Sequence, residues 1–374
     1  MPAIPCNRRR IENPDSDCPV WKLSDWDDCH CVLGYLTFKS FSHDGRYLFF
    51  ASDRTGAFQL YRLDLVRQEA AQITGPGGAV DAQGVPTEGR WRDVNVHPCR
   101  PEFTYCTDRA LYIAGVESLE QRILAECPAE WKRFDATPQF SADGKRLATV
   151  YELPDGRRGV AVGEVGDQPS RLESVLLGKP GDHIGYLIIA PVKDRFILSV
   201  CYGGPDRQND PAASRELRAR AWRLDADSRD FRPYLVMPPG FRATHQFYGP
   251  GGRLYFHRKT VGTWTPAWVA SIDIDGNDYR EHLRSADRKL GHGCISPNGN
   301  WLISDVQEPG RNELIHVPLT GGGEPQILFW PNASNGPRNE QETHVHPSAD
   351  FQGHYVAFQS DRDGKCGLYM LEVE

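Results

Sequence analysis

The sequence predicts an all-β protein that forms a single seven-bladed β-propeller. Its composition is the first reason: 36 glycines and 28 prolines place turns often along the 374 residues, and nine tryptophans supply large side chains between them. Such a mixture suits many short strands better than long helices. The second reason is a repeated segment whose copies follow one another roughly 45 to 58 residues apart, which is the spacing of four-stranded propeller blades.

Each copy of the repeat has the pattern of a β-hairpin. The first copy, FSHDGRYLFFASDRTGAFQLYRLDL, starts at Phe41, with turns at 44–45 and 53–56 and strands expected over 47–51 and 58–65. Related segments start at Phe140, Ala190, Tyr248, Cys294 and Asp350, and a weaker copy starts at Asn95. These copies predict about seven blades. Two β-sandwiches would need a linker and a break in the period, and the sequence has neither.

The repeat also predicts how the chain is divided. We expect an N-terminal extension, residues 1–29, that packs on the ring, followed by one propeller domain, residues 30–374. The C-terminal segment SDRDGKCGLYMLEV resembles SDRTGAFQLYRLDL near the N-terminus. This likeness predicts that the two ends of the chain contribute neighbouring strands or blades, which would close the ring.

Charge and hydropathy exclude some classes of partner. A net charge of −7 gives no global basic surface, which argues against nucleic acid as a ligand. No stretch reaches the roughly 18 apolar residues of a membrane span, and the N-terminal MPAIPCNRRRIENPDSDCP lacks the apolar core of a secretory signal. We therefore expect a cytoplasmic protein with no membrane partner, and the sequence does not predict the oligomeric state.

The ten cysteines are scattered along the chain without the spacing of a disulfide framework. Most are therefore expected to be reduced, buried thiols. Cys29 and Cys31 flank His30 and could form a soft-metal site with Cys6 or Cys18. No second pair of closely spaced cysteines supplies the remaining ligands of such a site.

The histidines are unevenly distributed. Those just before or within the opening segment of a blade are His97, His183, His245, His292, His344 and His346. Polar side chains near one mouth of a propeller can meet although they lie far apart in sequence, so these histidines are candidates for function. A surface or hydrogen-bonded role is expected for His43, His257, His282, His316 and His354, which fall in turns or outer strands.

The sharpest local signal is the segment NEQETHVHPS, which starts at Asn339. On an extended chain His344 and His346 point the same way, roughly 6 to 7 Å apart, which permits them to share one ion. Gln341 could add an amide oxygen, and His292 could add a third imidazole from another blade. Three imidazoles and one oxygen suit Mn²⁺, Fe²⁺ or Zn²⁺, and they leave the charge of the metal available to a substrate anion. The alternative is a pair of hydrogen-bonded histidines at the channel mouth.

From about residue 30 to its C-terminus the chain resembles the oligogalacturonate lyases, seven-bladed propellers that act on short pectin fragments. The matching segments are GYLTFKSFSHDGRYLFFASDRTGAFQLYRLDL, CYGGPD followed by ARAWRLD, ATHQFYGPGGRLYF, GHGCISPNGNWLISD and QETHVHPSADFQGHYVAFQSDRDGKCGLYMLEV. The most specific element combines Gln-x-x-His-x-His with a single histidine before the preceding blade and Thr-His-x-Phe one blade earlier. The resemblance implies that Mn²⁺, or another divalent cation, is bound by His292, Gln341, His344 and His346.

The resemblance also implies a reaction, the β-elimination of short 4-linked uronate oligosaccharides such as oligogalacturonides. The C5 proton of a uronate is only weakly acidic because the adjacent carboxylate is already negative, so a cation must first neutralise that carboxylate. His245 corresponds to the general base of the family, and a neutral histidine, with an ordinary pKa near 6.5, can accept a proton around neutral pH. Arg220 corresponds to the arginine beside the substrate. The glycosidic oxygen then leaves C4, which gives an unsaturated product.

The chain departs from the family pattern in segments expected to face the substrate. The longer insertion RQNDPAASRELR leaves Arg215 and Arg218 as alternatives to Arg220. Tyr202 stands where the family has a histidine, and the segment around His30 aligns only with a gap.

Substrate contacts are expected from His183, Tyr202 and His30. Other functions stay open at this stage: a non-catalytic propeller scaffold of the translocation-associated type, a metal-dependent hydrolase or epimerase, and a lyase that acts on a different uronate.

Overall fold

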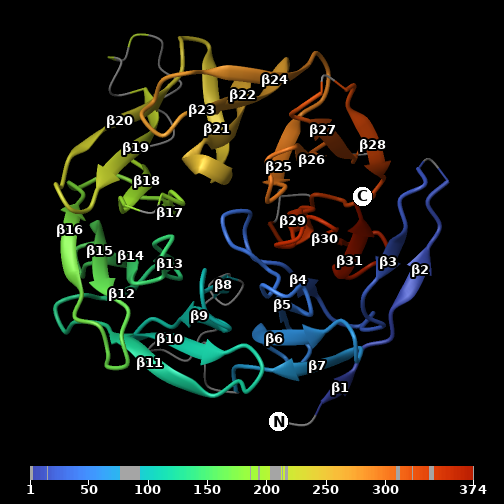
Figure 1. Cartoon of the computed structure of the whole chain (residues 1–374), viewed down its shortest axis with the longest axis horizontal. Helices are drawn as coiled ribbons and strands as arrows, with labels where there is room; N and C mark the ends of the chain where they lie inside the picture. The colour runs from blue at the N-terminus through green and yellow to red at the C-terminus, as the bar shows by residue number, and fades with distance from the viewer. Residues whose placement is uncertain are drawn as a thin grey trace. The chain divides into compact units, whose positions relative to one another are not determined.

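The structure is a computed structural model that describes residues 3–14, 16–75, 93–185, 187–192, 194–202, 212, 214, 218–308, 312–321, 323–336 and 341–373. The predicted fold class is confirmed, because the strands form seven antiparallel sheets of four or five strands, the blades of an all-β, seven-bladed propeller (Figure 1). Among the described residues the helical elements are two 3₁₀ segments, η2 (Pro250–Gly252) and η3 (Gln341–Thr343). Within that same part of the chain, no helix is long and apolar enough to cross a membrane.

The chain forms two compact units, Met1–Val96 with Arg288–Glu374, and His97–Asp287. The first unit contains three sheets. In sheet order they are β1 (Ile4–Pro5), β7 (Glu69–Gln72), β6 (Gln59–Asp64), β5 (Tyr47–Ser52) and β4 (Cys31–Val32); β25 (Leu290–Ile295), β26 (Trp301–Val306), β27 (Leu314–Pro318) and β28 (Gln326–Phe329); and β2 (Arg9–Ile11), β3 (Val20–Lys22), β31 (Gly367–Glu372), β30 (Tyr355–Ser360) and β29 (Ser348–Ala349).

The remaining four sheets follow one another along the chain. They are β8 (Asn95–Val96), β9 (Glu102–Cys106), β10 (Ala110–Gly115) and β11 (Gln121–Glu126); β12 (Arg133–Phe134), β13 (Gln139–Phe140), β14 (Arg146–Glu152), β15 (Arg158–Glu164) and β16 (Glu173–Leu177); β17 (Leu187–Ile189), β18 (Ile197–Cys201), β19 (Ala219–Asp225) and β20 (Phe231–Val236); and β21 (Phe241–Tyr248), β22 (Leu254–Thr260), β23 (Ala267–Ile272) and β24 (Arg280–Ser285).

The repeated Ser-x-Asp-Gly segment forms the turn that precedes the second strand of a blade. The Ser42 hydroxyl donates to Asp44 at 2.5 Å and accepts from the backbone N–H of Tyr47 at 2.9 Å. Gly45 has a φ of +70°, a conformation that glycine adopts without a steric penalty. The same contacts recur over residues 141–146. Two copies of the repeat therefore share the same turn contacts.

The two ends of the chain meet in one sheet, as predicted. In Figure 1 the blue strands β2 and β3 continue the red sheet of β29 to β31, and Trp21 pairs with Met370 in that register. Residues 4–5 form β1, the edge strand of the first blade, where Ile4 pairs with Ala70. The N-terminal residues thus supply strands to two blades. The division at residue 30 stays a prediction.

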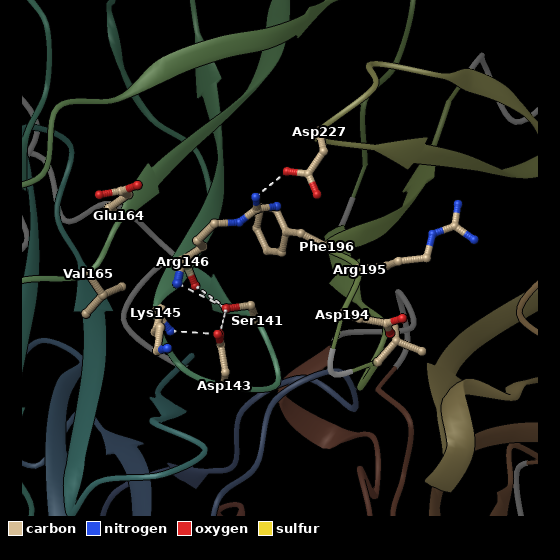
Figure 2. A pocket seen from close by; sticks show the side chains of 11 residues that line it. Ser141, Asp143, Lys145, Arg146, Glu164, Val165, Asp194, Arg195, Phe196 and Asp227 are labelled. Carbon is tan, nitrogen blue, oxygen red and sulfur yellow. Dashed lines mark hydrogen bonds and ion pairs between the residues drawn. The ribbon is translucent and has the colours of Figure 1, made fainter.

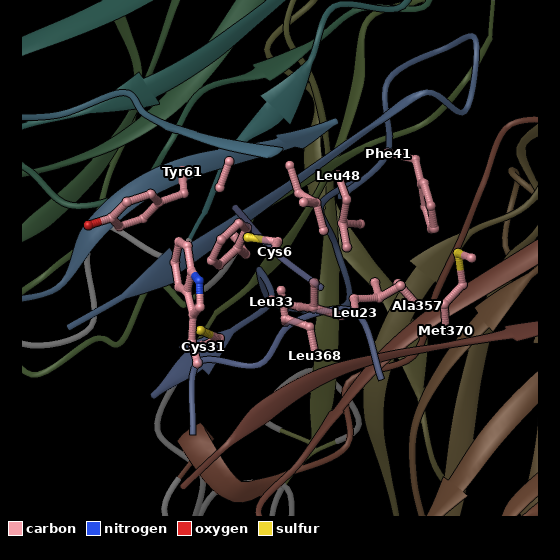
Figure 3. Close-up of a cluster of buried hydrophobic side chains, with 14 of the residues drawn as sticks. Cys6, Leu23, Cys31, Leu33, Phe41, Leu48, Tyr61, Ala357, Leu368 and Met370 are labelled. Carbon is pink, nitrogen blue, oxygen red and sulfur yellow. The ribbon is translucent and has the colours of Figure 1, made fainter. Parts of the chain in front are cut away.

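A shared hydrophobic core joins these strands within the first unit. Figure 3 shows Leu23 and Phe41 beside Leu48, Leu368 and Met370, all less than 5% exposed. Each such side chain contributes about 1.5–3 kcal/mol when it is fully buried. The core therefore stabilises the sheet that carries both chain ends together with the first blade.

Candidate functional site

The structure brings together three of the predicted metal ligands. His292 lies on β25, and His344 and His346 lie between η3 and β29. One nitrogen from each ring lies within 4.8 Å of those of the other two, and the three residues are 0%, 1% and 2% exposed. Among the described residues this is the only group of three or more His, Cys, Asp or Glu side chains gathered so closely.

Asp305 on β26 orients His292. Its Oδ1 accepts the backbone N–H of His292 at 2.6 Å, and its Oδ2 lies 3.1 Å from His292 Nδ1. Both residues are fully buried. A carboxylate behind a ligating imidazole fixes the ring and its tautomer and raises its basicity, and here the contact leaves Nε2 as the nitrogen to face an ion.

Gly291 makes room for this carboxylate. A Cβ added at Gly291 would lie 1.9 Å from Asp305 Oδ1, far inside van der Waals contact. The register of β25 against β26 shifts between Leu290 and Gly293, so His292 sits in a β-bulge. Bulges re-aim side chains next to functional sites, and this one frees His292 from the regular alternation of the strand.

Two further side chains lie against the histidine cluster. The Tyr35 ring meets the rings of His292 and His346 edge to face, with centroids 5.6 and 5.5 Å away. The amide nitrogen of Gln307 lies 3.0 Å from His292 Nδ1 and 3.3 Å from His344 Nδ1. Three buried imidazoles, one of them backed by a carboxylate, fit a divalent transition metal such as Mn²⁺, Fe²⁺ or Zn²⁺. The side chain of Gln341, the predicted fourth ligand, lies outside the described part of the structure.

His245 lies in the second unit, also in a β-bulge. The register of β21 against β22 shifts between Thr244 and Phe247, and His245 has a φ of +53°. Such a conformation is strained for a non-glycine residue and clusters at functional sites. The half-buried His245 ring meets the fully buried His257 ring at 5.9 Å between centroids. The expectation that His257 falls in a turn or an outer strand is wrong, because it is fully buried on β22, an inner strand of its sheet.

Arg220, at the start of β19, is half-buried and lies near His183. Desolvation and then the charges of Arg158 and Arg220 lower the pKa of His183, although much of that residue is exposed. The Tyr202 hydroxyl donates to Asp182 at 2.5 Å. The structure therefore groups three predicted site residues, Arg220, His183 and Tyr202, along neighbouring segments.

His30 and the two cysteines that flank it have other surroundings. His30 Nδ1 accepts the backbone N–H of Cys366 at 3.3 Å. Cys29 and Cys31 both lie 3.5 Å from the Ser52 hydroxyl. In the described residues these thiols do not gather a third ligand for a soft metal.

A separate pocket of about 410 Å³ lies in the second unit, and none of the predicted site residues is among those that line it (Figure 2). Arg146 reaches across it to form an ion pair with Asp227 and lies 4.2 Å from the centre of the Phe196 ring. The backbone N–H of Lys145 donates to Asp143. Because Arg146 is already paired, we assign this pocket a structural role between strands.

Four residues beside the site were not predicted from the sequence: Asp305, Gln307, Tyr35 and His257. A signal for Asp305 exists in WLISDV, where a carboxylate follows four residues of a strand that the repeat identifies as internal. A buried carboxylate needs a partner, and His292 on the adjacent strand could have been proposed as that partner.

Comparison with known proteins agrees with the resemblance seen in the sequence. No protein-family model matches the chain. The chain is 24% identical over 386 residues to the oligogalacturonate lyase of Dickeya dadantii, and 25% identical over 381 residues to the oligogalacturonide lyase of Pectobacterium atrosepticum. Each alignment covers 92% of this chain and 91% of the relative.

Among solved structures, an oligogalacturonate lyase in complex with manganese superposes with a TM-score of 0.83 at 20% identity. The match covers 100% of this chain and 98% of that chain. It shows that the two share their fold. The predicted resemblance to oligogalacturonate lyases is therefore confirmed, in sequence over most of the chain and in fold over all of it.

Proposed function

We propose that this chain is an oligogalacturonate lyase, a carbon–oxygen lyase that cleaves short 4-linked uronate oligosaccharides by β-elimination to unsaturated products. The observation that carries the proposal is the buried cluster of His292, His344 and His346 with Asp305 behind it. The similarity to two named lyases over 92% of the chain supports the reaction class. A binding scaffold would have no need for three buried imidazoles backed by a carboxylate.

The three histidines would hold a divalent cation, and Mn²⁺ is our proposal because a lyase of the same fold is known in complex with it. When bound, the cation supplies positive charge that offsets the uronate carboxylate and so makes the C5 proton more acidic. Gln341 completes the proposed ligand set. Asp305 keeps His292 in the tautomer that directs Nε2 to the ion.

His245 is the proposed general base. It accepts the C5 proton on a neutral imidazole nitrogen, and the bulge in β21 sets the direction of its ring. Arg220 donates hydrogen bonds to the uronate carboxylate and stabilises the negative charge that grows there in the transition state. The electrons of the broken C5–H bond form the C4–C5 double bond as the glycosidic oxygen leaves C4.

We propose oligogalacturonides as the substrate, with contacts from His183, Tyr202 and His30. The lowered pKa of His183 favours its neutral ring, which would act as a hydrogen-bonding group. Its place near Arg220 supports a contact with the sugar.

A product assay tests the proposal. The protein is dialysed against a chelator, reloaded with Mn²⁺ and incubated with di- and trigalacturonate, and the near-ultraviolet absorbance of the unsaturated product is followed. We expect absorbance to grow only after reloading. Asp64→Asn, which changes a residue of a different blade from the histidine cluster, serves as an active control. A reloaded protein that forms no unsaturated product from either substrate would refute the proposal.

A further inference from the structure

The second unit carries a pair of like charges that the proposed mechanism does not use. Arg242 on β21 and Lys259 on β22 are directly opposed in the antiparallel register. Like charges opposite each other destabilise a sheet. The guanidinium carbon of Arg242 lies 4.0 Å, and the Lys259 Nζ 4.2 Å, from the centre of the Trp264 ring. The indole therefore holds both cations through cation–π contacts.

The two cations differ in accessibility. Lys259 is 0% exposed, whereas Arg242 and Trp264 are half-buried, so Arg242 is the cation that a ligand can reach. Within the described part of the chain, Arg242 has no carboxylate partner. Arg258, the neighbour of Lys259 on the other face of the strand, instead pairs with Glu281 at 2.6 Å. Of these two partly buried arginines, Arg258 is paired with a carboxylate and Arg242 is available to a ligand.

The cationic pair lies beside the proposed base. Arg242 is three residues before His245 on the same strand, and Thr244, between them, pairs with His257. Burial and then the charge of Arg220 lower the pKa of Arg242, which indicates that the two guanidinium groups are close. A second positive site therefore adjoins the residues to which we assign proton transfer and carboxylate binding.

We propose that Arg242 binds a second carboxylate of the substrate, that Trp264 and Lys259 hold it in position, and that this subsite selects oligosaccharides with consecutive uronates. The inference rests on the proposed function, because it takes an oligogalacturonide as the ligand. Guanidinium and carboxylate groups form short, charge-assisted and often bidentate hydrogen bonds. A bound carboxylate also offsets the repulsion between Arg242 and Lys259. A neutral sugar at the same position gains neither effect.

Binding of trigalacturonate by calorimetry tests the subsite without turnover. The parent protein is metal-loaded His245→Ala, which is not expected to consume the ligand, and the test variant adds Arg242→Met. Arg284→Met is the matched control, because Arg284 is an exposed cation of the same sheet that lies 5.8 Å from the Trp268 ring. We expect Arg242→Met to weaken trigalacturonate binding about ten- to hundredfold, the usual range for a hydrogen bond to a charged group. Arg284→Met should leave it unchanged.

Two further measurements make the result specific. Arg242→Met should unfold at the same temperature as the parent or higher, because it removes a like-charge pair. Arg242→Lys should bind with intermediate affinity, since it keeps the charge and loses the bidentate geometry. Equal affinities of the Arg242→Met and Arg284→Met variants for trigalacturonate would overturn the subsite. The subsite would also be overturned if Arg242→Met lost as much affinity for neutral galactotriose as for trigalacturonate.

The outcome is separate from that of the product assay. If the wild type forms unsaturated product and Arg242→Met binds trigalacturonate normally, the subsite is wrong and the lyase proposal stands. If trigalacturonate binding depends on Arg242 and the wild type forms no product, the lyase proposal is wrong and the subsite stands.

Discussion

The carboxylate of Asp305 gives the most direct test of the metal site, because it touches a proposed ligand and would not touch the ion. The Asp305 Oδ1 accepts the backbone N–H of His292 at 2.6 Å. In Asp305→Asn this oxygen can still accept that hydrogen bond, so the strand pairing should survive. The charged partner 3.1 Å from His292 Nδ1 is lost. Outer-shell changes of this kind typically cost 10- to 100-fold in metal affinity, or about 1.4–2.7 kcal/mol.

Calorimetric titration of Mn²⁺ into the chelator-treated protein measures this loss, with thermal unfolding followed in parallel to confirm the fold. Asp64→Asn is the matched control, since Asp64 is also buried, at 5% exposed, and pairs with Arg46 in another blade of the same unit. An unchanged Mn²⁺ affinity in Asp305→Asn would refute the orienting role. An equal loss in both variants would refute it as well, because the effect would then be general.

The other predictions address the remaining parts of the site. His344→Ala should remove one proposed ligand and lower metal content after dialysis by an order of magnitude or more, and full retention would exclude this ligand. His245→Ala should keep its metal but lose roughly 10²- to 10⁴-fold in kcat with little change in KM, whereas wild-type turnover would remove it from the mechanism. Gly291→Ala should cost about 1–3 kcal/mol in the free energy of unfolding, since its Cβ would overlap a carboxylate oxygen, and a chemical denaturation curve that matches wild type would contradict this. A hydrogen bond from Cys31 outweighs desolvation and lowers the pKa of Cys29 to about 7. The thiolate absorbance that the wild type shows and Cys29→Ser lacks should therefore rise with a midpoint near pH 7, and a midpoint near the ordinary thiol pKa would contradict this.

The parts of the structure that follow from local chemistry could be predicted from the sequence. The Ser-x-Asp-Gly turns depend on contacts within six residues, and the spacing of the related repeat segments predicted about seven blades. His344 and His346 are separated by a single residue, so their rings can converge through the local backbone conformation alone. His292 is different, because its meeting with them depends on which blades are neighbours. Its place at the opening of another blade made it a candidate, and the family resemblance then assigned it to the ligand set.

Residues that act across strands could not be assigned in the same way. Asp305 lies beside His292 at the point where the register of β25 against β26 slips. If the pairing of Gly293 with Ser304 continued without a shift, His292 would also lie opposite Asp305. The direction of the His292 side chain would then be fixed by the regular alternation of the strand. The sequence does not indicate at which residue the register of two paired strands shifts.

The two histidines with the most specific proposed roles both lie in a β-bulge. Both His245 on β21 and His292 on β25 lie within the register shift of the first strand of their sheets. β25 is buried along its whole length and β21 in part, and an unbroken strand would point each ring to one of two fixed faces. A bulge adds one residue and turns the ring out of that alternation at a cost to only a few ladder hydrogen bonds. Placing each functional histidine in a bulge thus leaves the turn-to-turn pattern of the blades intact, which explains why the fold could be predicted from the repeat while the direction of these rings could not.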